Sequence, residues 1–156
     1  MATNCLGAVS PPSGGALRAN SCAIRENSCL NSVRKAMKDF NDGTYEIIGC
    51  AMHVHRAIGP GLREKPYENA LMVAFRNEKI SAVQQKPYPI YYEGTVVGDC
   101  IPDLTVGDVL VDAKSIEKIG DSERAQMLNY LRIAEKPVGL VINFRNAKLE
   151  WLRLVR

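Results

Sequence analysis

The sequence has no uninterrupted apolar stretch approaching the ~20 residues that a membrane-spanning helix requires. It also has no Cys-x-x-Cys pair, and its five cysteines are odd in number, so neither a zinc ribbon nor a closed disulfide framework is expected. These absences argue against a membrane protein and indicate a soluble protein of a reducing compartment. We therefore expect it in the cytoplasm.

A general excess of positive charge is also missing from most of the chain. Residues 1–36 hold four basic residues and one acidic residue, which accounts for the whole formal net charge of +3. Residues 37–156 are balanced, with 16 basic and 16 acidic residues. Any nucleic-acid binding must therefore depend on the local placement of charge, because no global basic field exists.

Composition divides the chain into two parts. Residues 1–36 are rich in Ser, Asn, Ala and Gly and show no sustained apolar period, which predicts a disordered or weakly ordered extension. Their basic composition is also similar to that of an organelle transit peptide, although a convincing amphipathic helix is missing. Alternatively, translation begins at Met37. Residues 37–156 have the length and apolar content of a single domain.

Hydrophobic periodicity predicts the elements of this domain. We expect helices from a Thr44 cap to Gly59, from Glu64 onward, and from an Asp121 or Ser122 cap to about Glu135. Strands are expected within 83–92, from which a turn at Glu93-Gly94 leads into 95–98, and within 101–106, 109–114, 138–144 and 148–155. The predicted order is α-α-β-β-β-α-β-β, in which a three-stranded meander precedes a crossover helix and a parallel return. This order indicates an α/β fold with a mixed β-sheet flanked by helices.

The sharpest local prediction is a hairpin over residues 99–114. Two β-rich runs flank Gly107-Asp108, and glycine at the first central position suits a two-residue type II′ turn. This turn fixes the register, so that each apolar pair falls on one face and the two aspartates fall on the other. The expected pairs are Val106 with Val109, Leu104 with Val111, and Asp103 with Asp112.

The polar face of this hairpin is a candidate metal site. Strand alternation returns Lys114 to the face of Asp112, opposite Asp103. Two opposed carboxylates beside an ammonium form a poor surface pair, because the like charges of the carboxylates repel. This repulsion should raise the pKa of at least one of the two aspartates. The same arrangement is a sensible site for a divalent cation. The alternative is a solvated hairpin face on which three charges meet by chance.

Two helices supply further candidates. Glu64 and Glu68 lie one turn apart on a common helix face. A carboxylate in the first turn of a helix usually does no more than interact favourably with the helix dipole, and the local sequence favours this role for both residues. Gln126 and Tyr130 stack at i and i+4 on the third helix. An amphipathic helix with a half-buried tyrosine explains this second pair nearly as well as a functional role.

Several short motifs occur together in the chain at a spacing typical of one protein family. They are Gly-x-x-Glu-x-x-Tyr at 61–67, Ile-Pro-Asp at 101–103, Asp-Ala-Lys at 112–114, Gln-x-x-x-Tyr at 126–130 and Val-Gly-Leu-x-x-Asn-Phe at 138–144. Together they resemble the GxxExxY proteins, a bacterial family within the PD-(D/E)XK nuclease superfamily. The resemblance covers roughly residues 40–155, and the family pattern begins close to Met37.

The resemblance implies a role for each matching residue. Asp103 and Asp112 would be metal-binding carboxylates, Lys114 the lysine of the third motif, and Glu64 the acidic residue of the preceding helix, which together would form the catalytic set. Gln126 and Tyr130 would hold phosphate or orient the active-site face. The third motif has aspartate where glutamate is more usual, and the shorter side chain would alter metal preference.

The implied chemistry is hydrolysis of phosphodiesters in DNA or RNA with Mg²⁺, or Mn²⁺, held by Asp103, Asp112 and Glu64. Lys114 would position the attacking water or stabilise the anionic transition state. The alternative is a catalytically silent nuclease-fold module that binds nucleic acid or a protein partner, since fold alone does not decide activity. A homodimer is a further expected arrangement.

Overall fold

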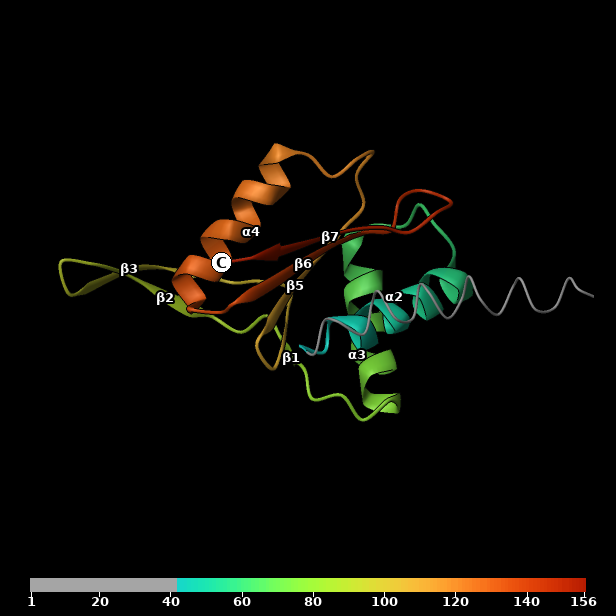
Figure 1. Ribbon diagram of the computed structural model, residues 1–156, viewed down its shortest axis with the longest axis horizontal. Coiled ribbons are helices and arrows are strands. Elements are labelled where there is room, and N and C mark those ends of the chain that lie inside the picture. Colours follow the sequence, from blue (N-terminus) through green and yellow to red (C-terminus); the bar gives the residue numbers. More distant parts are fainter. Residues whose placement is uncertain (1–41) are drawn as a thin grey trace, which may run out of the picture. The chain divides into compact units, whose positions relative to one another are not determined.

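The computed structural model describes residues 42–156. The predictions for residues 1–36 and for a start at Met37 lie outside these residues. The described helices and strands, in chain order, are α2 (Thr44–Ile58), α3 (Glu64–Asn77), β1 (Val83–Gln84), β2 (Tyr88–Tyr92), β3 (Thr95–Cys100), β4 (Leu104–Val106), β5 (Val109–Lys114), α4 (Asp121–Ala134), β6 (Val138–Asn143) and β7 (Glu150–Val155) (Figure 1). None of these helices is long and apolar enough to cross a membrane.

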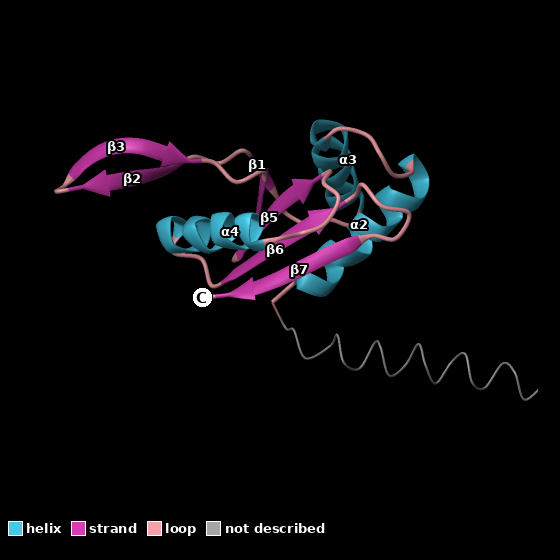
Figure 2. Ribbon diagram, turned by 90° about the horizontal axis from the view of Figure 1, so that it is seen from above, coloured by secondary structure: helices cyan, strands magenta, loops and turns pink. Residues whose placement is uncertain are grey.

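The main sheet has five strands in the order β1-β4-β5-β6-β7. Neighbouring strands of this sheet run antiparallel, except for β5 and β6, which are parallel and are joined through α4. A parallel pair needs a long crossover connection, and α4 supplies it. The predicted mixed sheet flanked by helices, with a crossover helix and a parallel return, is therefore confirmed (Figure 2).

The two faces of this sheet bury separate apolar clusters. One cluster joins α2 and α3 to the sheet through residues such as Ile47, Leu71 and Leu104. The other joins α4 to the opposite face through Met127 and Leu131. Strand β6 is buried along its whole length, as its continuous apolar sequence predicts, because helices cover it on both sides. The sheet is thus the middle layer of three.

Gly139 of β6 sets how closely α4 approaches the sheet. A Cβ atom added at Gly139 would lie 2.5 Å from Met127 Sδ and 3.2 Å from Leu131 Cδ1. Atoms at such a distance overlap, so α4 can pack this closely only where the strand has no side chain. The close approach holds the α4 residues beside the β5 face that carries Asp112.

The loop between α2 and α3 is fixed by Tyr67. Its hydroxyl donates to Gly59 O at 2.7 Å and accepts from Leu62 N at 3.1 Å, while its ring stacks on Phe144 with centroids 4.4 Å apart. Tyr67 is completely buried. The tyrosine of the Gly-x-x-Glu-x-x-Tyr motif therefore orders the loop that precedes Glu64.

The hairpin β4–β5 has the predicted register. Leu104 pairs with Val111 and Val106 with Val109, which leaves Gly107 and Asp108 as the loop. Gly107 has φ of 56°, the positive value that a type II′ turn needs at its first central position. The apolar residues of the two pairs are buried in the cluster under α2 and α3, on the face opposite the aspartates.

The predicted three antiparallel strands before the crossover helix are present as β1, β4 and β5, but the first of them does not extend over the whole 83–92 segment. Only β1 from the 83–92 segment joins the main sheet, where it pairs with β4 at the edge, whereas β2 pairs with β3 in a separate two-stranded sheet. Pro87 and Pro89 interrupt the segment and cannot donate ladder hydrogen bonds, so the chain leaves the sheet there. We call the hairpin formed by β2 and β3 the arm, and it projects beyond α4 (Figures 1 and 2).

The predicted helix caps are also wrong by one position. Thr44 is the first residue of α2, and Gly43 with φ of 81° precedes it, while Asp42 Oδ1 accepts from Thr44 N at 3.0 Å. Asp121 likewise opens α4 behind Gly120, whose N–H donates to Glu123 Oε2 at 2.8 Å. In both helices an acidic side chain binds a terminal amide that the helix itself leaves without a partner.

Candidate active site

Asp103 and Asp112 meet at one end of the β4–β5 hairpin. Asp103 lies one residue before β4, and its Oδ2 accepts from Ala113 N at 2.8 Å across the ladder. Asp112 lies within β5 and is only 3% exposed. The register that buries the apolar pairs on one face therefore brings both carboxylates together on the other, as the alternation of the strands predicts.

Lys114 completes the predicted trio. Its Nζ lies 2.9 Å from Asp112 Oδ2, and the lysine side chain is largely buried. Burial by itself lowers the pKa of Lys114, but the charge of Asp112, with smaller contributions from Glu64 and Asp103, raises it above the usual value. Lys114 is therefore a fixed cation directly beside two carboxylates.

The electrostatics at Asp103 are dominated by burial and by like charge. Burial and the Asp112 carboxylate raise the pKa of Asp103 from 3.8 to about 7, while the Ala113 amide opposes the rise and Glu68 adds to it. Two carboxylates in a low-dielectric site cannot both ionise cheaply, so one retains a proton. The expected rise of one pKa is therefore found, and it falls on Asp103.

Glu64 approaches the site from the first turn of α3. Its Oε1 accepts from Ser115 N at 3.3 Å, and Ser115 Oγ donates to Leu62 O at 2.6 Å. These contacts attach the loop before α3 to the end of β5, next to Lys114. Glu64 is exposed and raises the pKa of Lys114 through its charge, so the structure brings it to the lysine side of the site.

Glu68 is a candidate residue that the sequence-based selection did not include. It is only 3% exposed, and it raises the pKa of Asp103 through its charge. Gln84 of β1 donates to Glu68 Oε1 at 2.8 Å, and Lys65 Nζ lies 2.8 Å from its Oε2. The spacing of Glu64 and Glu68 on one helix face is the sequence signal that marks both as candidates. In the structure the charge of Glu68 acts on Asp103.

Gln126 and Tyr130 of α4 face the same end of β5. Gln126 Nε2 donates to Tyr130 Oη at 2.8 Å, which confirms the predicted i, i+4 contact. Burial and then the Asp112 charge raise the pKa of Tyr130. The pair therefore lies within electrostatic reach of the carboxylates, and its neutral phenol is a hydrogen-bond donor near Asp112.

The residues present suit a hard divalent cation. Within residues 42–156, Asp112 Oδ2 is a buried oxygen that accepts no well-formed hydrogen bond, although it lies in an ion pair with Lys114. No three His, Cys, Asp or Glu side chains of the described chain are arranged to hold a metal by themselves. Mg²⁺ commonly takes one or two carboxylates and completes its shell with water and substrate oxygens, so a pair of aspartates is sufficient.

A shallow hollow of about 350 Å³ adjoins the Glu64 side of the site. Its lining includes Arg63 and Arg145, which are exposed, together with Glu64 and Ser115. Two guanidinium groups beside Glu64 provide local positive charge in a domain whose formal charge is balanced. The hollow is therefore the part of this surface best suited to an anionic ligand.

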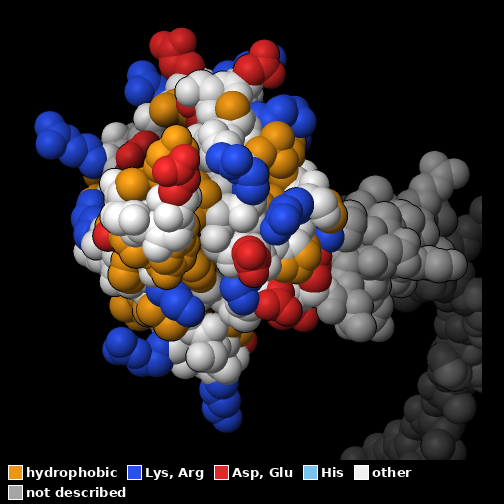
Figure 3. All heavy atoms as spheres, turned by 90° about the vertical axis from the view of Figure 1, so that its left-hand side faces the viewer, with side chains coloured by type: hydrophobic (Ala, Val, Ile, Leu, Met, Phe, Trp, Pro, Cys, Tyr) orange, Lys and Arg blue, Asp and Glu red, His pale blue; other side chains and the backbone are white. Residues whose placement is uncertain are grey.

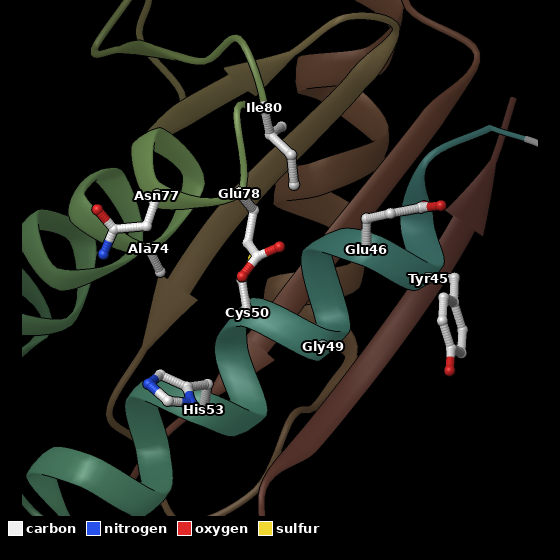
Figure 4. Close-up of a pocket in the computed structure, with 9 residues that line it drawn as sticks. All are labelled: Tyr45, Glu46, Gly49, Cys50, His53, Ala74, Asn77, Glu78 and Ile80. Carbon is white, nitrogen blue, oxygen red and sulfur yellow. The ribbon is translucent and has the colours of Figure 1, made fainter.

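A separate pocket of about 450 Å³ lies between α2 and the end of α3 (Figure 4). Its lining includes Cys50, His53 and Glu78, and Figure 4 shows the Glu78 side chain directed toward Cys50. Burial, followed by the charges of Glu78 and Glu46, raises the pKa of Cys50, so the thiol stays protonated and unreactive. The pocket holds none of the predicted site residues.

Comparison with known proteins identifies the family. The family model described as PD-(D/E)XK nuclease superfamily matches residues 41–154. Among curated proteins, no significant match was found. A solved structure titled "Crystal structure of SSO0001" is similar at 11% sequence identity and a TM-score of 0.49, over 59% of this chain and 49% of that chain, so the present chain spans about half of it. On the family match, which extends over most of its length, the chain belongs to the PD-(D/E)XK nuclease superfamily.

Proposed function

We propose that this protein is a metal-dependent phosphodiester hydrolase that cleaves DNA or RNA. The observation that carries the proposal is the grouping of Asp103, Asp112 and Lys114 at the end of one buried hairpin. Membership of a nuclease superfamily agrees with this activity. A purely structural role gives no reason to bury two facing carboxylates, because their repulsion opposes folding.

Within the superfamily, we assign the chain to the GxxExxY proteins. The motif residues support this assignment through the roles that they play together. Tyr67 anchors the loop at Gly59 and Leu62, and Glu64 then binds the Ser115 amide at the end of β5. The Gly-x-x-Glu-x-x-Tyr segment thus attaches α3 to the strand that carries Asp112 and Lys114.

Asp103 and Asp112 would hold the divalent cation, with Glu68 or Glu64 reaching it through water. A bound Mg²⁺ or Mn²⁺ supplies an activated water and neutralises charge on the phosphate oxygens. The aspartates must give up the proton that Asp103 retains before they can act as two charged ligands. The chain's contribution is therefore a pair of preorganised oxygen ligands in a buried position.

The remaining residues would position the substrate. Lys114, held by Asp112, would donate to the scissile phosphate or orient the attacking water. Tyr130, held by Gln126, would donate a hydrogen bond to a phosphate oxygen. Arg63 and Arg145 would contact the neighbouring backbone in the hollow beside Glu64.

A nuclease panel tests the proposal. The full chain is incubated with single- and double-stranded DNA and RNA in Mg²⁺, in Mn²⁺ and in EDTA, beside Asp103→Ala and Lys114→Ala. We expect metal-dependent cleavage that both substitutions abolish, and a Glu46→Gln control in the separate pocket retains it. Cleavage that persists in both site variants indicates a contaminant, and binding without cleavage under every condition contradicts the hydrolase in favour of a silent binding module.

The proposal places the enzyme in the cytoplasm. Cys50 and Cys100 are buried free thiols, and burial raises the pKa of each, which suits a reducing compartment without requiring disulfides. Cell fractionation with an antibody to the native protein tests the location. Recovery from an oxidising compartment would contradict it.

A further inference from the structure

A groove lies where the arm meets the C-terminal half of α4. It has a volume of about 220 Å³ and is lined by Pro89, Ile90, Tyr91, Arg132 and Ile133. Arm and helix run beside each other there in both ribbon views (Figures 1 and 2). The groove is outside the Asp103–Asp112 site, and none of its residues belongs to the catalytic set proposed above.

The groove combines an aromatic ring, an apolar wall and one cation. Tyr91 is 65% exposed, which is unusual for a large aromatic side chain on a strand. Arg132 is exposed and forms no ion pair or side-chain hydrogen bond within residues 42–156. An accessible aromatic face beside an available guanidinium matches a nucleotide, which has a flat base and an anionic phosphate.

The arm connects this groove directly to the candidate active site. Cys100, the last residue of β3, is separated from Asp103 by two residues and pairs with Tyr88 across the arm. Tyr88 Oη lies 3.2 Å from Thr105 Oγ1, which anchors the root of the arm on β4. Tyr91 is three residues further along β2, about 10 Å at the rise of a strand.

The charge of the arm restricts which nucleic acid would fit. Residues 88–100 include Glu93 and Asp99 but no Lys or Arg. Figure 3 views the arm end-on and shows hydrophobic side chains gathered there, with many of the basic side chains around them. A duplex presents its phosphates outward and its bases inward, so an acidic, apolar arm suits it poorly. An unpaired strand presents its base faces, which stack on aromatic side chains.

We propose that the groove between the arm and α4 is a base-binding subsite for unpaired nucleic acid. Tyr91 would stack on a base, Pro89 and Ile133 would complete the apolar wall, and Arg132 would bind the adjoining phosphate. This proposal rests on the proposed function and specifies its substrate class as single-stranded DNA or RNA, or unpaired segments of a longer nucleic acid.

Equilibrium binding in EDTA tests the subsite apart from turnover. Fluorescence polarisation is measured with labelled single-stranded DNA and RNA oligonucleotides, and with a duplex of the same length, using the full chain. We expect tighter binding of at least one single strand than of the duplex. Tyr91→Ala should weaken single-strand binding about tenfold, within the range known for base–aromatic stacking, whereas Tyr91→Trp should preserve it.

A second variant tests the role of the Arg132 guanidinium. Arg132→Ala should weaken single-strand binding and reduce its dependence on salt, because one phosphate contact is lost. Matched controls are Arg76→Ala, which removes a last-turn arginine from α3, and Tyr45→Ala, which removes an exposed tyrosine from α2. Both controls should bind like the wild type.

Three results would overturn the subsite. The first is wild-type binding of the duplex at least as tight as that of every single strand. The second is a loss of binding in Tyr91→Ala no greater than in Tyr45→Ala. The third is a wild-type dimer that Tyr91→Ala converts to a monomer in light scattering, which would assign the patch to a second copy of the chain.

The binding and cleavage assays separate this proposal from the proposed function. Single-strand binding that depends on Tyr91, without cleavage in any metal, would contradict the hydrolase and leave the subsite standing. Metal-dependent cleavage with Tyr91 and Arg132 variants that behave like the wild type would support the hydrolase and remove the subsite.

Discussion

The two hairpins of this protein are neighbours in sequence and opposites in environment. Both close with a two-residue loop that contains glycine: the arm turns at Glu93 and Gly94, both with positive φ, and the β4–β5 hairpin turns at Gly107. The β4–β5 hairpin lies inside the main sheet, with helices on both faces. The arm exposes Tyr91 and Tyr92 to 65% and 66%.

This difference shows what burial contributes to a site. The β4–β5 hairpin fixes its carboxylates in a low-dielectric setting, which raises the pKa of Asp103 and favours a bound cation. An isolated two-stranded hairpin is only marginally stable in water, so the arm can adjust to a ligand at little cost. We therefore assign catalysis to the β4–β5 hairpin and substrate binding to the arm.

The largest expected effect separates the two hairpins by kinetics. Asp112→Asn removes one charged ligand and should lower kcat by roughly 100-fold or more, since even outer-shell changes at metal sites cost 10–100-fold. Tyr91→Ala should raise KM for single-stranded substrate and leave kcat within about twofold, because it removes only a stacking contact. Steady-state kinetics with Mg²⁺ measure both. A loss of kcat in Tyr91→Ala equal to that in Asp112→Asn would contradict the division of roles.

A second contrast concerns folding. Leu104→Ala should lower the free energy of unfolding by about 2–5 kcal/mol, because it leaves a cavity under α2 and α3. Val96→Ala on the exposed arm should change it by no more than about 0.5 kcal/mol. Urea unfolding followed by circular dichroism gives both values. Equal costs would mean that the arm is packed against something in solution.

Metal binding should stabilise the fold through the β4–β5 hairpin alone. Mg²⁺ at 100 times its Kd adds about 2.7 kcal/mol by mass action, which raises Tm by roughly 10 °C for a domain of this size. Asp112→Asn should abolish the response, and Val96→Ala should keep it. A Tm of the wild type that is unchanged by both Mg²⁺ and Mn²⁺ contradicts the prediction.

The last contrast concerns the pH dependence of stability without metal. The pKa of Asp103 is raised from 3.8 to about 7, so the folded state holds a proton that the unfolded state releases in between. Stability from this group is full below about pH 4 and is lost as the pH rises through 7. Asp103→Asn, which stays neutral, should flatten the decline between about pH 4 and 7. Parallel curves for wild type and variant would show that Asp103 does not retain the proton.

The β4–β5 hairpin could be predicted because its determinants are local. Strand alternation and the Gly107 turn fix the register, and the register places Asp103 near Asp112. The sign of the pKa change at the facing carboxylates followed from Coulomb repulsion alone. The position of Lys114 on the face of Asp112 followed from the two-residue alternation of side chains that every strand has.

The arm and Glu68 could not be predicted with the same means. The prolines at 87 and 89 indicate an irregular strand, but they do not reveal that the chain pairs with β4 before them and with β3 after them. Glu68 shares its helix face with Glu64, but its burial beside Asp103 depends on how α3 packs against the sheet. Such information is non-local, so a short window of sequence does not contain it.

The central claim is that Asp103 and Asp112 hold a divalent cation. Calorimetric titration of Mn²⁺ into the full chain at pH 7 tests it directly, beside Asp112→Asn and the Glu46→Gln control. We predict saturable binding in the wild type and the control, with uptake of a proton by the buffer as Asp103 loses it, and no binding in Asp112→Asn. Equal binding by Asp112→Asn and the wild type, or no binding by either, would contradict it.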